Sequence, residues 1–387
     1  MSTPVDGPSD RARAWASTSG GHVGAGGVVQ AHVDAEPSVE IRAPRGREER
    51  EALEEQFLQP GATRAVGAGE RALAEAPDVE RTCFERDRDR ILHSAAFRRL
   101  AGKTQVFVYP ADHQRTRLTH ALEVAQVATS VARGCGLNVS LTEAIAIGHD
   151  CGHGPGGHAS EDAFDAFLPG GYDHAVWGAD VMLAPLNLCA QTLDGVRNHS
   201  WSRPAPSTPE GVVVSWADRV AYTAHDLEDA VHAGIVDPGD LPADVAAVCG
   251  RSRREQLAAF VGELVRCTSA TGVIGMSADH AQALAGLRTF NYERIYTRPE
   301  ALAQSASVVR ILRALVEHYL ANPQALPADF QPGAPRLPTT LDVDERVGAA
   351  VTYVGGMTDR FAFRTAVELL DWPAVELPVG IDIPRAT

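Results

Sequence analysis

The chain has 387 residues, of which 44% are hydrophobic and 22% charged, as in a globular protein large enough for a sizeable core. Its formal net charge of −15 argues against non-specific nucleic-acid binding, so charge does not indicate single-stranded DNA as a partner. The sequence has no apolar run of membrane-spanning length, no cationic start followed by an apolar block, and no paired spacing among its six cysteines. We expect a cytoplasmic protein with reduced thiols and no membrane partner.

The N-terminal segment differs in composition from the rest. Residues 1–45 are rich in Gly, Ala, Ser and Pro and lack periodicity, which predicts a disordered tail. A charged helical segment over 47–58 ends at Gln59-Pro60-Gly61. Residues 46–387 are expected to form one folded domain, with a first part at about 80–235 and a C-terminal helical part at about 236–370.

Helical periodicity dominates from residue 81 onward. It predicts helices over 81–100, 116–133, 141–148, 174–183, 186–188, 190–193, 211–233, 255–266, 281–287, 301–320, 344–352 and 359–370, and another starting at 158. Residues 104–109 are β-prone and predict a short extended segment, and Ser140-Leu141-Thr142-Glu143 matches a capping box. Because strands do not alternate with helices, the predicted fold class is mostly α.

The chemistry centres on the stretch His149-Asp150-Cys151-Gly152-His153-Gly154-Pro155-Gly156-Gly157-His158-Ala159-Ser160-Glu161. A His-Asp pair can place an imidazole nitrogen and a carboxylate oxygen on one divalent metal. His120 lies on the preceding helix and Asp218 on a later apolar one. Each residue alone is weak evidence, because a single histidine on an apolar helix is more often part of the core. Together they suit one Mn, Mg, Fe, Co or Zn ion with open positions.

Basic residues gather just upstream of this stretch: Arg81, Arg86, Arg88, Arg90, Arg98, Arg99, Lys103, Arg115 and Arg117. A basic segment beside candidate metal ligands suits a small polyanionic substrate. For most of these arginines, solvated helix faces with local salt bridges are the simpler interpretation.

Further motifs occur in a fixed order over residues 80–365. They are Arg86-Asp87-Arg88-Asp89-Arg90-Ile91, the run from Ala96 to Phe107, Arg115-Thr116-Arg117-Leu118-Thr119-His120, Trp216 to Tyr222, His225 to Asp229, Asn291 to Tyr296 and Gly356-Met357-Thr358-Asp359-Arg360. With the His, His-Asp, Asp set, the chain resembles HD-domain phosphohydrolases, and among them the bacterial dGTPase-like deoxynucleoside triphosphate triphosphohydrolases. The resemblance implies an HD-type catalytic domain over 46–387, with an HD-domain helical fold and its metal core at about 80–235. The implied reaction is metal-dependent hydrolysis of dNTPs to deoxynucleoside and tripolyphosphate, for dNTP-pool control. It also implies a homo-oligomer, often a hexamer, and admits a dNTP activator.

The resemblance also assigns roles to individual residues. The implied metal ligands are His120, His149, Asp150 and Asp218. The implied catalytic residues are His158 with Glu161, and His174. The implied substrate contacts are Gln105, Arg117 and His153, with Tyr222 and Asp226 at the deoxyribose. Tyr222 is the main candidate for excluding a ribose 2′-hydroxyl. The alternative, that Tyr222 is a tyrosine of the core without a role in binding, has equal weight.

Two departures and two other interpretations stay open. Gly154-Pro155-Gly156-Gly157-His158 stands where many relatives have Pro-Pro-Phe-Gly-His, which predicts a softer loop. Ala175-Val176-Trp177 stands where many have Asn-Ala-Gln, so the nucleobase preference is not fixed. The alternatives are an HD phosphohydrolase acting on another nucleotide, such as a deoxynucleoside monophosphate, and a nucleotide-sensing protein with a silent site.

Overall fold

The structure is a computed structural model that describes residues 7–33, 43, 45–67, 69–110, 113–334 and 343–380. The chain divides into two compact units, Met1–Arg45 and Gly46–Thr387. The first holds helix α1 (Asp10–Ser17) and an antiparallel pair of two-residue strands, β1 (His22–Val23) and β2 (Val29–Gln30). The sequence indicated none of these elements. Since α1 buries none of its residues, its helix rests on local interactions, and disorder of the tail stays a prediction.

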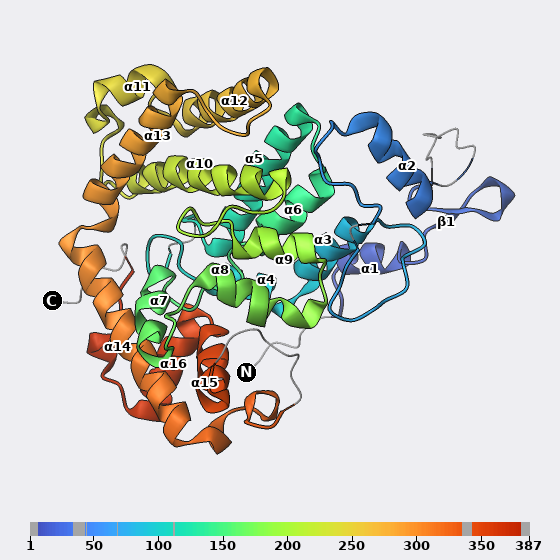
Figure 1. Cartoon of the computed structure of the whole chain (residues 1–387). Helices are drawn as coiled ribbons and strands as arrows, with labels where there is room; N and C mark the ends of the chain where they lie inside the picture. Colours follow the sequence, from blue (N-terminus) through green and yellow to red (C-terminus); the bar gives the residue numbers. More distant parts are fainter. Residues whose placement is uncertain are drawn as a thin grey trace. The chain divides into compact units, whose positions relative to one another are not determined.

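The second unit is built from helices (Figure 1). Its first part contains α2 (Arg47–Phe57), α3 (Cys83–His93), α4 (Ala95–Arg99), α5 (Arg117–Cys135), α6 (Val139–Gly148), α7 (His158–Phe164), α8 (His174–Trp177), α9 (Ala190–Arg197) and α10 (Pro209–His232). Its second part contains α11 (Ala243–Cys249), α12 (Arg253–Thr271), α13 (Ala278–Asn291), α14 (Pro299–Ala321), α15 (Glu345–Gly355) and α16 (Asp359–Leu370). The mostly α class is confirmed. Among the described residues, none of these helices is both long and apolar enough to cross a bilayer.

The start of α6 differs from the prediction. Its N-cap is Asn138, whose side chain accepts from the N–H of Leu141 at 3.2 Å, so the capping box at Ser140 was wrong. The side-chain amide of Asn138 also donates to Glu54, 84 residues away, at 3.0 Å. This tertiary contact favours Asn138 over the locally predicted cap.

Two other segments also depart from expectation. Residues 104–109 form no strand; Thr104 makes only an isolated antiparallel bridge to Thr116. Residues 186–188 do not continue a helix, because Asn187 adopts a left-handed backbone with φ of 51°. The short helix α11 was not predicted.

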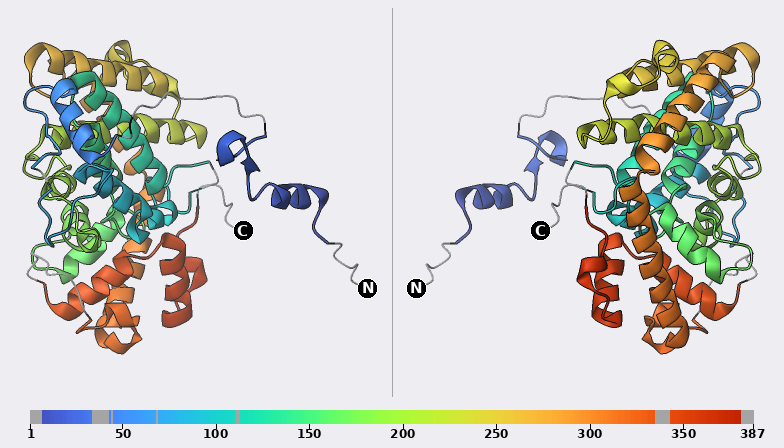
Figure 2. Two further views of the ribbon diagram at one scale, coloured as in Figure 1. Left: turned by 90° about the vertical axis from the view of Figure 1, so that its right-hand side faces the viewer. Right: turned by 90° about the vertical axis from the view of Figure 1, so that its left-hand side faces the viewer.

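Two groups of buried side chains hold the second unit together. The first packs α5, α6 and α10 with α3, α9, α12 and α13, and includes the fully buried Phe84 and Ile145. The second packs α7 with α14, α15 and α16, and includes Phe164 and Phe363. Figures 1 and 2 show α14–α16 grouped near α7. Since α6 belongs to the first group and α7 to the second, residues 149–158 lie where the two groups meet.

Candidate active site

The four predicted metal ligands converge on one centre. His120 comes from α5, His149 and Asp150 directly follow α6, and Asp218 comes from α10. Nε2 of His120 lies 3.1 Å from Oδ1 of Asp218. Nε2 of His149 lies 3.4 Å from Oδ1 of Asp150 and 3.6 Å from Oδ1 of Asp218. Three mutually packed helices therefore place two imidazoles and two carboxylates on a common point.

The donor set fits a divalent metal. Nδ1 of His149 lies 2.6 Å from the carbonyl of Ala146, which assigns a proton to Nδ1 and leaves Nε2 as the atom that can ligate a metal. That Nε2 is buried and has no hydrogen-bond partner. Ligand atoms of His120, His149 and Asp150 lie within 4.8 Å of one another. A buried imidazole nitrogen that has no hydrogen-bond partner and faces carboxylates has the position that a mixed N/O metal site requires.

The same groups perturb one another's pKa values. Burial alone would raise the pKa of Asp150, but the charges of His149 and Arg117 outweigh it and hold that pKa well below its usual range. Burial would lower the pKa of His149, but Asp150 and Asp218 raise it to about 9. The carboxylates thus hold a proton on His149 that a divalent cation would displace on binding.

The glycine loop (residues 152–157) brings a row of histidines beside this centre. His153 stacks on His174, with ring centroids 3.7 Å apart, and its Nε2 lies 3.4 Å from Oδ1 of Asp150. His174 begins α8, and its Nδ1 is hydrogen-bonded to the carboxylate of Glu161. The backbone N–H of His174 also donates to that carboxylate at 3.3 Å. Glu161 therefore pairs with His174, whereas the sequence led us to expect a pair with His158.

His158 forms the open side of this row. Its ring centroid lies 5.0 Å from that of His153 and 6.0 Å from that of His174. Unlike His153, which is buried, His158 is exposed to solvent. The surrounding protein and the charge of Arg117 lower the pKa of His158, favouring its neutral form.

Several buried polar atoms in this region have no partner. Nη1 of Arg117 donates to Oδ2 of Asp150 at 2.7 Å, while its Nε and Nη2 are buried and unpartnered. Nδ1 of His153 and Oε1 of Gln105 are in the same condition. Gln105 adjoins Thr104, whose carbonyl lies against Gly157. Such atoms are costly, and around a metal centre they are the groups that a bound polyanion would satisfy.

The face of α10 continues away from Asp218 through Tyr222 and Asp226. Tyr222 is half-buried, and its hydroxyl accepts from Nε of Arg288 at 2.8 Å. Asp226 accepts from the hydroxyl of Tyr296 at 2.6 Å, and burial raises the pKa of Asp226 to about 8. The deoxyribose contacts assigned to Tyr222 and Asp226 stay predictions.

Sequence reasoning missed a further buried histidine beside the centre, His199. Its Nε2 lies 3.3 Å from Nε2 of His174, and with His149 and Asp218 it forms a second group of ligand atoms within 4.8 Å. Its Nδ1 lies 2.7 Å from the carbonyl of Val196. A lone histidine after α9 carries no motif, so only the packing of α9 on α6 reveals it. Arg288 and Tyr296 were also not singled out.

Most of the upstream basic residues make local ion pairs, as expected. Arg81 pairs with Asp78 and Asp89, and Arg86 and Arg90 both pair with Glu75. Lys103 and Arg117 turn toward the glycine loop instead.

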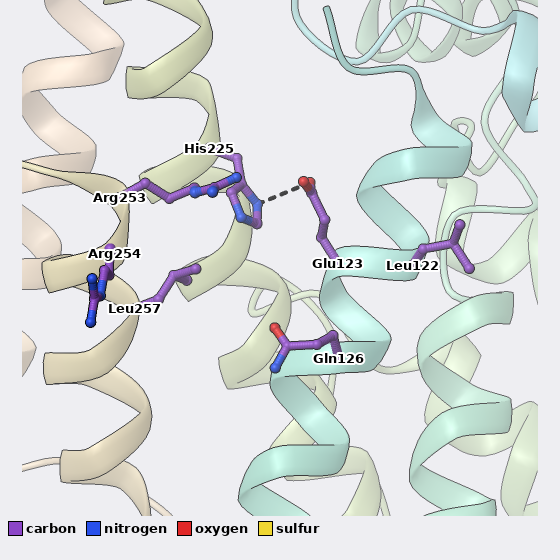
Figure 3. A pocket seen from close by; sticks show the side chains of 7 residues that line it. All are labelled: Leu122, Glu123, Gln126, His225, Arg253, Arg254 and Leu257. Atoms are coloured by element: carbon purple, nitrogen blue, oxygen red, sulfur yellow. Dashed lines mark ion pairs between the residues drawn. The ribbon is translucent and has the colours of Figure 1, made fainter. Parts of the chain in front are cut away.

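A cavity of about 480 Å³ lies elsewhere, between α5, α10 and α12 (Figure 3). His225 lines it; burial lowers the pKa of His225 to about 3, and its Nδ1 faces Glu123 at 3.1 Å outside hydrogen-bonding geometry. Arg253, also in the lining, is paired with Glu228. None of the predicted site residues lines this cavity, so the candidate active site is separate from it.

Comparisons with known proteins agree with the resemblance. Residues 117–223 match the HD domain, and residues 274–368 match the phosphohydrolase-associated domain. A deoxyguanosinetriphosphate triphosphohydrolase-like protein of Caldanaerobacter subterraneus is 38% identical over 86% of this chain and 96% of its own length. A protein of the same description from Clostridium perfringens is 37% identical over 75% of this chain and 87% of its own length. One from Deinococcus radiodurans is 35% identical over 84% of this chain and 99% of its own length. A crystal structure of a hypothetical Aquifex aeolicus protein matches at 16% identity and a TM-score of 0.40 over 60% of this chain and 61% of that one, which supports no functional inference.

Proposed function

The chain belongs to the deoxyguanosinetriphosphate triphosphohydrolase-like family of HD-domain proteins, and from this premise we propose that it hydrolyses deoxynucleoside triphosphates to deoxynucleoside and tripolyphosphate. Its role would be control of the dNTP pool. The observation that carries the proposal is the set of buried, unpartnered polar atoms of Arg117, Gln105 and His153 beside the metal-type centre. A triphosphate supplies the oxygens and charge that these groups lack.

The residues divide the work as follows. His120, His149, Asp150 and Asp218 would hold a divalent ion, which when bound supplies Lewis-acid polarisation of a phosphoryl group and a water of lowered pKa. Nε and Nη2 of Arg117 would donate to phosphate oxygens, and His153 and His158 would lie along the triphosphate.

Proton transfer falls to the histidines. The leaving 5′-oxygen needs a proton when the α-phosphoryl bond breaks. Glu161 accepts from Nδ1 of His174, which fixes the ring and directs its Nε2 toward the centre. His158, beside His153, is the second candidate for this role. The variants His158→Ala and His174→Ala decide between them. The variant that lacks the proton donor should lose kcat, whereas the other should keep it.

The test is a product assay. Purified protein with Mn²⁺ or Mg²⁺ receives each dNTP, alone and mixed, and ion-pair chromatography separates the products. We expect deoxynucleoside with tripolyphosphate, abolished in Asp150→Ala and retained in Asp162→Ala, an exposed acid on α7. Monophosphate with pyrophosphate, or turnover of deoxynucleoside monophosphates alone, would overturn the assigned reaction. Nucleotide binding without turnover under every condition would instead favour a sensor. Turnover only in the mixture would indicate the predicted dNTP activator.

A further inference from the structure

The glycine loop is held by residues far away in the sequence. The N–H of Gly156 donates to Oδ1 of Asp359 at 2.8 Å, across 203 residues. Gly156 and Gly157 have φ of 72° and 65°, and a Cβ at Gly157 would lie 2.8 Å from Nη2 of Arg117 and 3.0 Å from the carbonyl of Thr104. A Cβ at Gly156 would collide with Val308 of α14. The glycines thus give a closely packed loop, and the softness expected from the missing aromatic stays a prediction.

Asp359 is the residue that joins this loop to the segment before α5. It is 2% exposed, and while Oδ1 binds Gly156, Oδ2 accepts from the N–H of Thr104 at 3.0 Å and from its hydroxyl. An acid at the start of a helix often serves only that helix. Here the side chain of Thr358 already caps α16 by accepting from the N–H of Phe361. The carboxylate of Asp359 is therefore not needed to cap α16, and it accepts from the glycine loop instead.

Lys103 makes a second connection between the same parts. It is 1% exposed, and its ammonium donates to the carbonyl of His153 and, at 2.9 Å, to the carbonyl of Gly355 at the end of α15. Its own carbonyl accepts from the N–H of Arg117 at 3.2 Å, at the start of α5. Burying an ammonium group away from water costs free energy. The hydrogen bonds to the two carbonyls must therefore offset that desolvation cost.

We propose that Asp359 and Lys103 are positioning residues that fix the glycine loop against Thr104 and the start of α5. They would thereby set the spacing of His153 and His158 from Gln105 and Arg117. In this inference, which rests on the proposed function for its substrate, α15 and α16 complete the active site without contributing a residue that touches substrate.

The test is Asp359→Asn in the full chain. Asn keeps the shape of the side chain but replaces one acceptor oxygen by an NH₂ group. In either orientation of the amide, this NH₂ group faces the N–H of Gly156 or the N–H of Thr104, so one of the two hydrogen bonds is replaced by a repulsion. We expect kcat to fall about 10- to 100-fold, as for a misplaced catalytic group, with Mn²⁺ stoichiometry unchanged. Peptides covering residues 152–157 should also exchange amide hydrogen faster than in the wild type.

The matched control is Asp344→Asn. Asp344 is an exposed acid that caps α15 through the N–H groups of Arg346 and Val347, and because Asn also caps helices well, the variant makes the same change of charge in the same helical group without touching the loop. We expect normal kcat in this variant. If Asp359→Asn shows normal kcat and normal exchange at 152–157, the positioning role is refuted, whatever its melting temperature.

Thr104→Val keeps the test decisive if Asp359→Asn does not fold. It removes only the hydroxyl that donates to Asp359, and we expect a smaller loss of kcat with faster exchange at 152–157. Unchanged values for both would refute the proposal. If the wild type hydrolyses no dNTP, the proposed function fails, but the exchange measurements still support or refute the attachment of the loop to Asp359.

Discussion

Asp226 makes the stability of the protein depend on pH in a calculable way. Its carboxyl has a pKa of about 8 in the folded protein against 3.8 ordinarily, because it is buried with only the hydroxyl of Tyr296 donating to it. Between about pH 4 and pH 8 the folded state therefore keeps a proton that the unfolded chain has lost. Across that window the free energy of unfolding falls as pH rises, by about 1.4 kcal/mol per pH unit from this group.

Asp226→Asn removes this titration, since an amide carries no such proton. The free energy of unfolding of the variant, minus that of the wild type, should rise by about 3 kcal/mol between about pH 5.5 and about pH 7.5. Urea unfolding followed by circular dichroism, in one chelator-containing buffer series, measures this difference. Tyr296→Phe removes the donor that lowers the pKa of Asp226, so it should extend the window to higher pH. A difference that stays constant across pH would refute the reasoning.

Three further outcomes follow from packing and ligation. Gly157→Ala and Gly272→Ala both place alanine at positive φ, costing about 1 kcal/mol in backbone strain, but only at Gly157 would the new Cβ approach other atoms, 3.0 Å from the carbonyl of Thr104. Gly157→Ala should therefore lose turnover in a steady-state assay, while Gly272→Ala keeps it. Phe84→Ala should cost about 3–5 kcal/mol in urea unfolding with kcat unchanged; a loss below about 1 kcal/mol would contradict its place in the core. His149→Ala should retain its helical circular dichroism but lose Mn²⁺ in equilibrium dialysis, and full retention of the ion would exclude the assigned centre.

The sequence predicted the long helices well because each repeats apolar residues every three to four positions. The ranges expected at 116–133, 211–233 and 359–370 match α5, α10 and α16 to within about two residues. Prediction from neighbouring residues failed where contacts with residues distant in the sequence, or a single left-handed residue, set the ends of a helix. Asn138 caps α6 because Glu54 also holds its side chain, and Asn187 ends a helical segment where composition alone favoured one.

The candidate site was predictable to the extent that its residues share a motif. The metal-type centre of His120, His149, Asp150 and Asp218 was assembled from the family pattern, and the structure brings these residues together. The pairing of Glu161 with His174 depends on how α8 approaches α7, and spacing along one helix suggested a different partner. His199 reaches the centre only through tertiary packing, so no spacing rule identifies it.

The hydrogen bond between Gly156 and Asp359 has a consequence for the order in which the protein is synthesised. The four candidate metal ligands are synthesised before Asp359, and at elongation rates of about 5 to 20 residues per second the interval from Asp218 to Asp359 lasts roughly 7 to 28 s. A nascent chain thus carries the whole candidate ligand set while its glycine loop still lacks the anchor from α16. A truncated message that encodes Asp218 but not Asp359 would yield a product with the candidate metal ligands and an unanchored glycine loop.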